Sequence, residues 1–270
     1  MSDPGEVIGG FIADADAVAL FSPSAAEYER YLDADGVDLV VIAPDDVVDA
    51  DHFIELPIEF EDIRDRIRFG LEGGMDQGLF EDGDIVTCVA KMFAEELDSI
   101  TRVRATESIH TGIYDLLVNS RAEAEVIRDV LELVIELGKK GQKGEPVGAL
   151  FVVGDAGKVM NKSRPLSYNP FEKSHVHVGD SIVNVMLKEF SRLDGAFVIS
   201  DSGKIVSAYR YLEPAAEGID IPKGLGTRHM AAAAITRDTN AVSVVLSESD
   251  GLIRAFKGGE LVLELDPEAY

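Results

Sequence analysis

The first half of the chain alternates short apolar runs with segments of helical period. The apolar runs cover residues 18–21, 37–42 and 85–89, and the helical segments between them cover 24–32 and 57–70. Strand signals that alternate with helix signals are typical of an α/β layer whose sheet is partly parallel. No catalytic residues gather in this half, and the isolated His52 and His110 favour surface or capping roles.

The second half begins with a long amphipathic helix and continues mainly as strands. Apolar residues recur at helical spacing over 121–140, where Gly138 and Gly141 act as stop signals. After a basic break, the pattern predicts strands over 147–153, 195–199, 204–211 and 241–246, helices over 181–193 and 229–236, and a hairpin over 252–265. We therefore place an N-terminal α/β domain over 1–115 and a second α/β domain over 116–270.

The charge of the chain argues against one large class of partners. The 270 residues include 25 Lys and Arg against 50 Asp and Glu, which gives a formal net charge of -25. Binding to phosphate backbones needs an excess of Lys and Arg, so we expect no binding to nucleic acids or anionic membranes. Acid spread along the whole chain favours a halophilic, archaeal source, because salt screens repulsion to within about 3 Å at 1 M. An ordinary acidic protein is the alternative.

The remaining composition favours a cytoplasmic protein. Hydrophobic residues make up 46% of the chain, which is enough for a sizeable core. Cys88, the single cysteine, lies in an apolar run and is expected to be a small buried side chain rather than a reactive thiol. No apolar run reaches the roughly 18 residues of a membrane span, and the first residues lack the basic start of a signal peptide. We therefore expect a soluble protein of the cytoplasm.

One segment combines several features of an anion-binding site. It reads Gly224-Leu-Gly-Thr-Arg-His229 and precedes an alanine-rich helical stretch. Glycines let backbone N–H groups approach a ligand, and the start of a helix favours negative charge. Arg228 and His229 would add side-chain donors at the same place. The segment predicts a phosphate or carboxylate site, with a helix cap that happens to carry both side chains as the alternative.

Three other motifs are weaker when each is judged alone. Asp194-Gly-Ala196 begins an apolar strand, where a carboxylate can hold a hard cation, although Asp-Gly is also a common turn. Ser247-Glu-Ser-Asp-Gly251 follows a strand and is typical of a turn. His175 and His177 have the spacing of two metal ligands on one strand face. No further His or Cys lies near them in the sequence, which favours a half-exposed strand.

Taken in order, these pieces resemble the diadenylate cyclase domain, most of all in its archaeal form. The resemblance spans residues 120 to 265 and rests on V-G-A-L-F-V-V-G-D, S-R-P-L-S-Y-N-P-F, L-D-G-A-F-V-I-S, G-L-G-T-R-H-M-A-A and V-L-S-E-S-D-G. The N-terminal half resembles, to a lesser degree, the α/β domain at the end of pyruvate kinase. The implied architecture is this α/β domain, a candidate regulatory domain, followed by a cyclase domain with a central mixed sheet flanked by helices.

The resemblance implies an enzyme that condenses two ATP molecules into cyclic di-AMP and releases two pyrophosphates, with Mn²⁺ or Mg²⁺. Each 3′-hydroxyl would attack the α-phosphate of the ATP in the facing subunit, so the implied partner is a second copy of the chain in a homo-oligomer. Asp194 would bind the metal and activate the 3′-hydroxyl, with Arg228 and His229 completing the catalytic set. The implied ATP-binding residues are Gly195, Ala196, Leu212 near the adenine, Gly226, Thr227, Arg228, His229, Ser247 and Glu248.

One position departs from the family pattern. Where the family usually has a second arginine, directly after His229, this chain has Met230, whose thioether cannot pair with phosphate. Either turnover is weakened or another cation substitutes, and the candidates, which the sequence does not rank, are Lys223, Arg210 and Lys257.

Two other hypotheses therefore stay open beside the cyclase. The first is a catalytically weak or silent sensor that binds adenine nucleotides in the same pocket. The second is a metal hydrolase centred on His175 and His177, whose activity would survive the loss of Asp194.

Overall fold

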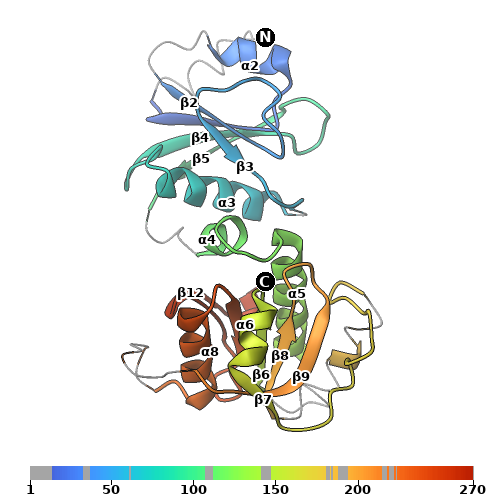
Figure 1. The fold of residues 1–270 in the computed structure, drawn as a ribbon. Helices are drawn as coiled ribbons and strands as arrows, with labels where there is room; N and C mark the ends of the chain where they lie inside the picture. Colours follow the sequence, from blue (N-terminus) through green and yellow to red (C-terminus); the bar gives the residue numbers. More distant parts are fainter. Residues whose placement is uncertain are drawn as a thin grey trace. The chain divides into compact units, whose positions relative to one another are not determined.

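The computed structural model describes residues 14–32, 37–60, 62–106, 112–140, 147–180, 183, 185–187, 194–214, 218, 222 and 224–269. The chain divides into two compact units, Met1–Tyr114 and Asp115–Tyr270, and each has its own sheet (Figure 1). Both sheets are mixed and flanked by helices, which confirms the predicted α/β class. His110, Lys223 and most of the helix predicted over 181–193 lie outside the described residues.

The N-terminal unit contains a five-stranded sheet in the order β3-β2-β1-β4-β5. Its strands are β1 (Ala17–Phe21), β2 (Asp38–Ala43), β3 (Phe53–Glu55), β4 (Ile85–Ala90) and β5 (Ser99–Arg104). All neighbours are parallel except β4 and β5. The central β1 is buried along its whole length, as its unbroken apolar run requires. The strands predicted over 18–21, 37–42 and 85–89 are confirmed, whereas the short β3 and the half-exposed β5 were not predicted.

Among its described residues this unit has the helices α2 (Ala25–Leu32) and α3 (Ile63–Asp76), and α4 (Ile113–Val118) begins at its last residues and continues into the second unit. The helix predicted over 57–70 was misplaced at both ends. α3 begins after Asp62, whose side chain accepts a 2.8 Å hydrogen bond from the Arg64 N–H. It continues past Gly70 through Gly73 and Gly74, which pack directly against aromatic rings that leave no room for larger side chains.

Cys88 behaves as the sequence predicted. Its side chain is buried in β4, and burial raises the pKa of the thiol to about 12. The thiol therefore stays protonated and acts as a small apolar side chain.

The second unit contains a seven-stranded sheet in the order β12-β11-β10-β6-β8-β9-β7. Its strands are β6 (Ala149–Val153), β7 (Ser163–Pro165), β8 (Ala196–Ile199), β9 (Ile205–Leu212), β10 (Val242–Leu246), β11 (Ile253–Lys257) and β12 (Glu260–Leu265). β6 and β8 are parallel, and all other neighbouring pairs are antiparallel. The four strands and the hairpin predicted for this half are confirmed, and β7 is an additional short edge strand.

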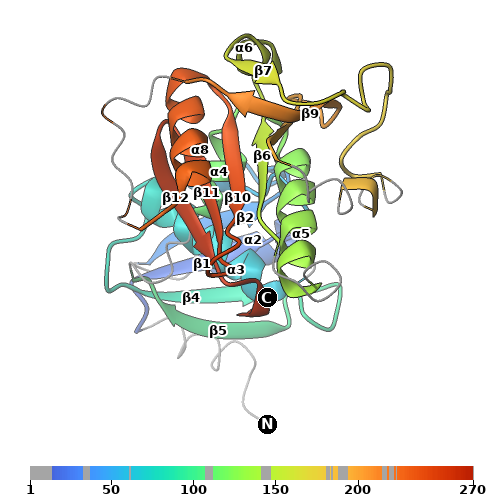
Figure 2. The same ribbon diagram turned by 90° about the horizontal axis from the view of Figure 1, so that it is seen from below.

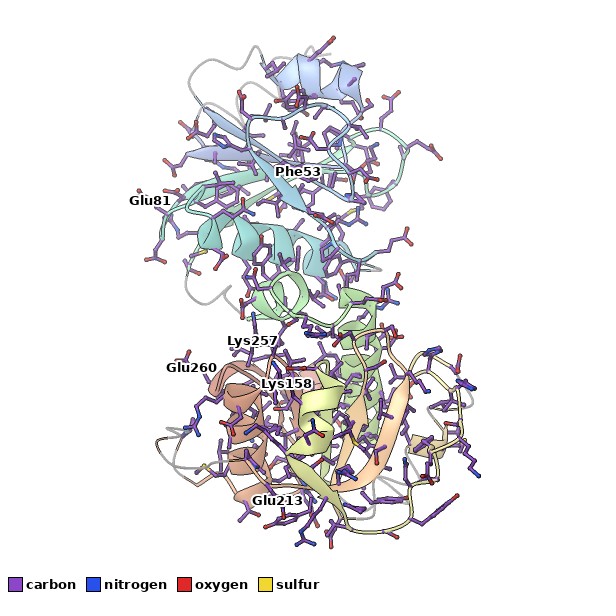
Figure 3. The ribbon with its side chains drawn as sticks, viewed as in Figure 1. Phe53, Glu81, Lys158, Glu213, Lys257 and Glu260 are labelled. Carbon is purple, nitrogen blue, oxygen red and sulfur yellow. The ribbon has the colours of Figure 1, made fainter. Side chains whose placement is uncertain are left out.

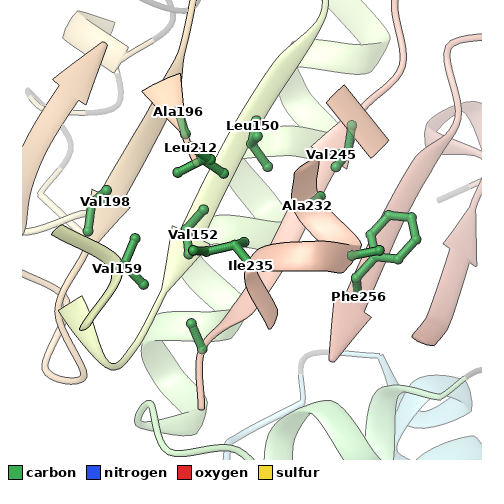
Figure 4. Packing of buried hydrophobic residues seen from close by; sticks show 12 residues of the cluster. Leu150, Val152, Val159, Ala196, Val198, Leu212, Ala232, Ile235, Val245 and Phe256 are labelled. Atoms are coloured by element: carbon green, nitrogen blue, oxygen red, sulfur yellow. The ribbon is translucent and has the colours of Figure 1, made fainter. Parts of the chain in front are cut away.

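Helices cover both faces of this sheet. α5 (Ala124–Lys140) packs on one face against β6, β10 and β11, and α8 (Thr227–Asp238) covers β10, β11 and β12 on the other (Figure 2). The short α6 (Ala156–Asn161), which was not predicted, lies against β6 and β8. Under α8 the core joins Ala232, Ala233 and Ile235 to the apolar side chains of the sheet (Figure 4). Alanines at these positions let the helix lie close to the strands.

None of the helices in the described part of the chain combines the length and the apolar character that a membrane span requires.

Candidate active site

A cleft of about 620 Å³ opens at one end of the sheet in the second unit. All the residues that the sequence analysis assigned to the site line it: Asp194, Gly195, Ala196, Leu212, Gly226, Thr227, Arg228, His229, Ser247 and Glu248. Leu150, Leu166, Arg210, Tyr211, Ala231 and Ser249 complete the lining. The cleft thus joins an apolar wall to a row of charged and hydrogen-bonding groups.

The topology of the sheet explains why these residues meet. β8 begins at Ala196, and its antiparallel neighbour β9 ends beside that point, with Arg210 opposite Ala196. β6 runs parallel to β8, and β10 runs antiparallel to β6. The last residue of β10, Leu246, therefore lies opposite the first residue of β6, Ala149. The starts of β6 and β8 and the ends of β9 and β10 therefore lie at the same end of the sheet.

The backbone conformation at this end of the sheet requires a glycine at position 195. Its φ of +106 lies in the region that favours glycine, and a Cβ there would lie 2.8 Å from the carbonyl carbon of Tyr209. Tyr209 itself has a φ of +57, and the register between β8 and β9 shifts next to it. This close approach of two strands fixes the backbone next to Asp194, whose side chain is exposed at the cleft.

The start of α8 supplies donors for an anion. Its N-cap, Gly226, has no side chain that could accept hydrogen bonds from the N–H groups of the first turn. An uncapped helix start attracts negative charge, and Arg228 adds a guanidinium that lies 4.0 Å from the Glu248 carboxylate. Both of these side chains line the cleft, so a phosphate group would find one positive and one negative neighbour there.

His229 lies deeper in the cleft wall. The residue is 5% exposed, and neither ring nitrogen has a hydrogen-bond partner among the described residues. Burial lowers the pKa of His229, and the positive charges of Arg254 and Arg228 lower it further against the opposing effect of Asp250. A neutral imidazole with one free donor and one free acceptor therefore lines the site.

This burial predicts a dependence of stability on pH. Because the pKa of His229 is lower in the folded chain, the unfolded chain binds the proton more readily below about pH 6.5. Stability should therefore fall as the pH drops below that value, by up to about 1.4 kcal/mol for each unit of pKa difference. His229→Leu should lose less stability between pH 7.5 and 5.5 than the wild type does, measured by urea unfolding. Equal losses in both proteins would contradict this assignment.

A buried arginine holds the turn that follows β10. The side chain of Arg254 is 7% exposed; it donates to the Asp250 carboxylate at 2.8 Å and to Glu264 at 2.7 Å. Arg254 keeps the pKa of Asp250 well below its usual range. The turn carries Ser247 and Glu248, so this network positions two residues of the cleft. This network was not predicted from the sequence, although Arg254, four residues after Asp250, was a usable signal.

The structure also distinguishes the candidates for the missing arginine. Lys257 binds the Asp115 carboxylate at 2.8 Å, and it lies at the opposite end of the sheet from Glu213, which follows Leu212 (Figure 3). Arg210 instead lines the cleft and is 9% exposed. Its side chain donates to neutral oxygens of Ser163 and Met160, and no carboxylate of the described residues pairs with it. Of the two described candidates, only Arg210 lines the cleft.

The carboxylates at the cleft fit a divalent cation that arrives with a phosphate ligand. Asp194 and Glu248 both line the cleft, and Mg²⁺ commonly binds one or two protein carboxylates together with substrate phosphates. Within the described ranges, no group of three or more His, Cys, Asp or Glu side chains could hold a metal without such a ligand. His175 and His177 are exposed and lie outside the cleft lining, so a hydrolase centred on them finds no third ligand there.

Comparison with known proteins identifies both units. The family model described as "Diadenylate cyclase, N-terminal" matches residues 1–125, and the model described as "DisA bacterial checkpoint controller nucleotide-binding" matches residues 136–261. These two matches together run through both sheets of the structure.

Relatives from three organisms resemble the chain. A diadenylate cyclase of Haloferax volcanii is 68% identical over 265 residues, which cover 98% of each chain. One from Methanocaldococcus jannaschii is 43% identical over 64% of this chain and 57% of its own. The cyclic di-AMP synthase CdaA of Bacillus subtilis is 38% identical over 33% of this chain and 32% of its own. Given the full-length match and the two family models, the chain belongs to the diadenylate cyclase family of nucleotidyltransferase enzymes.

Proposed function

We propose that this chain condenses two ATP molecules into cyclic di-AMP in the cytoplasm and releases two pyrophosphates. The observation that supports this most is the single cleft that gathers Asp194, the start of α8 and Glu248. Such a cleft offers a metal-binding carboxylate, donors for a triphosphate and an apolar wall for a base, which are the groups that ATP needs. Membership of the diadenylate cyclase family supports the same reaction.

In this proposal the nucleotide lies between the apolar wall and the start of α8. Leu212 lies beside the adenine, and the backbone of residues 195–196 approaches the nucleotide without obstruction from a side chain at 195. The triphosphate meets the first turn of α8, where Thr227, Arg228 and His229 supply side-chain donors. Arg210 is the remaining cation of the cleft and takes the place of the arginine that Met230 replaces.

Asp194 accepts the proton of the 3′-hydroxyl in the proposed reaction. The 3′-oxygen then attacks the α-phosphorus of the ATP held by the facing subunit, the bond from that phosphorus to the bridging oxygen breaks, and pyrophosphate leaves. Arg228 offsets the negative charge that the phosphoryl oxygens carry during the attack. Two such attacks close the ring of the product.

Asp194 and Glu248 would hold Mn²⁺ or Mg²⁺ together with the phosphates, with Ser247 beside them. When bound, the ion supplies positive charge that neutralises the reacting phosphates. The active form is at least a homodimer, because each chain has one copy of Asp194 and one of Arg228 and therefore one nucleotide site. The twofold symmetry of the product matches two such sites opposed across an isologous interface.

The direct test is to incubate the purified protein with ATP and Mn²⁺ and to search for cyclic di-AMP by mass spectrometry. We expect the product together with two equivalents of pyrophosphate. ATP binding without any product would favour the nucleotide sensor, the function that the replacement of an arginine by Met230 suggests. Failure to bind ATP at all would rule out both functions.

The acid excess of the chain leads to a prediction about salt. The formal net charge is -25, and repulsion among these charges weakens the folded state until salt screens it. The melting temperature should therefore rise steadily from dilute buffer to molar KCl. Differential scanning calorimetry over that range checks this, with equal osmolarity of sucrose as a control for excluded volume. A flat or falling melting temperature in KCl would leave only an ordinary acidic protein.

A further inference from the structure

Gly148, directly before β6, lies against two side chains of the cleft. A Cβ atom at this position would overlap Nη1 of Arg228, and it would lie 3.1 Å from both the Arg228 Cζ and the Glu248 Cβ. The guanidinium of Arg228 therefore occupies the space in which the side chain of any other residue would begin. Gly148 itself is not part of the cleft lining.

The glycine is needed here for space and not for backbone conformation. Unlike Gly195, Gly148 does not have a φ in the left-handed region, so its backbone is open to any residue. The atoms nearest to an added Cβ belong to the end of the long Arg228 side chain and to Glu248. An added methyl group would consequently displace the guanidinium rather than strain the strand.

Few other contacts fix the position of Arg228. Among the described residues its guanidinium has one ion-pair partner, Glu248 at 4.0 Å, and it makes no hydrogen bond. Its side chain is 31% exposed, so solvent weakens that pair. The open space at Gly148 is thus a determinant of where the guanidinium lies.

We infer that Gly148 is a positioning residue of the cyclase, which acts by seating the Arg228 guanidinium beside Glu248 at the mouth of the phosphate site. The inference rests on the proposed function, in which Arg228 binds the triphosphate.

The first test is Gly148→Ala. The variant should keep the melting temperature of the wild type but lose about tenfold to a hundredfold in kcat/KM for ATP, because a displaced cation no longer meets the transferring phosphate. Calorimetric titration should show weaker ATP binding as well. Gly157→Ala is the matched control, since a Cβ at this helical glycine of α6 meets no atom within 4 Å. It should leave activity and ATP binding unchanged, and it should leave the melting temperature equal or slightly higher, because alanine favours a helix more than glycine does.

A double-mutant cycle with Arg228→Ala isolates the route of the effect. If Gly148 acts through Arg228, the added methyl should change kcat/KM and ATP affinity less than twofold once the guanidinium has been removed. Should Gly148→Ala lower the melting temperature, Arg228→Ala should restore it by clearing the same space. An effect that persists undiminished in the Arg228→Ala background would overturn the inference.

The same cycle separates this inference from the proposed function. If Arg228→Ala alone leaves ATP binding and product formation intact, then Arg228 does not bind the triphosphate, and the proposed site is wrong. If Arg228→Ala abolishes both while Gly148→Ala changes neither, the site stands and only the role of Gly148 falls.

Discussion

Asp194→Asn should reduce cyclic di-AMP formation by about a hundredfold to a thousandfold, because the amide neither accepts the 3′-hydroxyl proton nor offers a charge to the metal. The side chain is exposed just before β8, and the close approach of Gly195 to β9 fixes the backbone beside it. The fold should therefore be unaffected. Initial rates from chromatographic separation of ATP and product give the result, and circular dichroism checks the fold.

The matched control for this change is Asp266→Asn, which neutralises an exposed acid outside the cleft lining. Its rate should equal that of the wild type. Near-normal turnover in Asp194→Asn would remove this carboxylate from the mechanism, and a loss of similar size in both variants would point to a general effect of charge.

Inactive chains should suppress active ones if two clefts must face each other. With a tenfold excess of Asp194→Asn chains and free exchange of subunits, about nine in ten wild-type chains would face an inactive partner, and the rate should fall about tenfold by mass action. Mixed pairs can make one phosphodiester bond but cannot close the ring, so a linear intermediate should accumulate. Mass spectrometry measures both products in the same sample.

The control is a sample in which the wild-type and Asp194→Asn proteins are mixed immediately before the assay. Wild-type pairs that have not yet exchanged subunits should keep their full rate. Light scattering during the assay gives the second criterion. Full activity from chains that stay monomeric throughout would refute the proposed dimer.

Much of the cleft lining was predictable because the residue types that suit an anion site leave local marks in a sequence. Paired glycines before a helix, an arginine and a histidine in its first turn, and an Asp-Gly at the start of a strand were all visible, and the structure brings them into one cleft. The central strands were equally visible, since buried strands such as β1 and β6 are unbroken apolar runs.

The features that were missed depend on contacts between distant parts of the chain. The Arg254 network is defined by a partner on the next strand, Glu264, and the role of Gly148 depends on a side chain of α8. Likewise, α3 continues past the predicted end at Gly70 through Gly73 and Gly74, where the rings of Tyr114 and Phe80 fill the space beside the helix. Local propensity carries no information about such neighbours.

The order of strands in the second sheet has a consequence for the synthesis of the protein. β6 is made early in this unit, yet one of its two neighbours is β10, which is made near the end, and Ser247 and Glu248 follow β10 directly. A growing chain on the ribosome therefore lacks part of the cleft lining until translation is almost complete. A ligand stabilises only a chain that can bind it, so the stabilising effect of any ligand of this cleft reaches the finished polypeptide and not its nascent fragments.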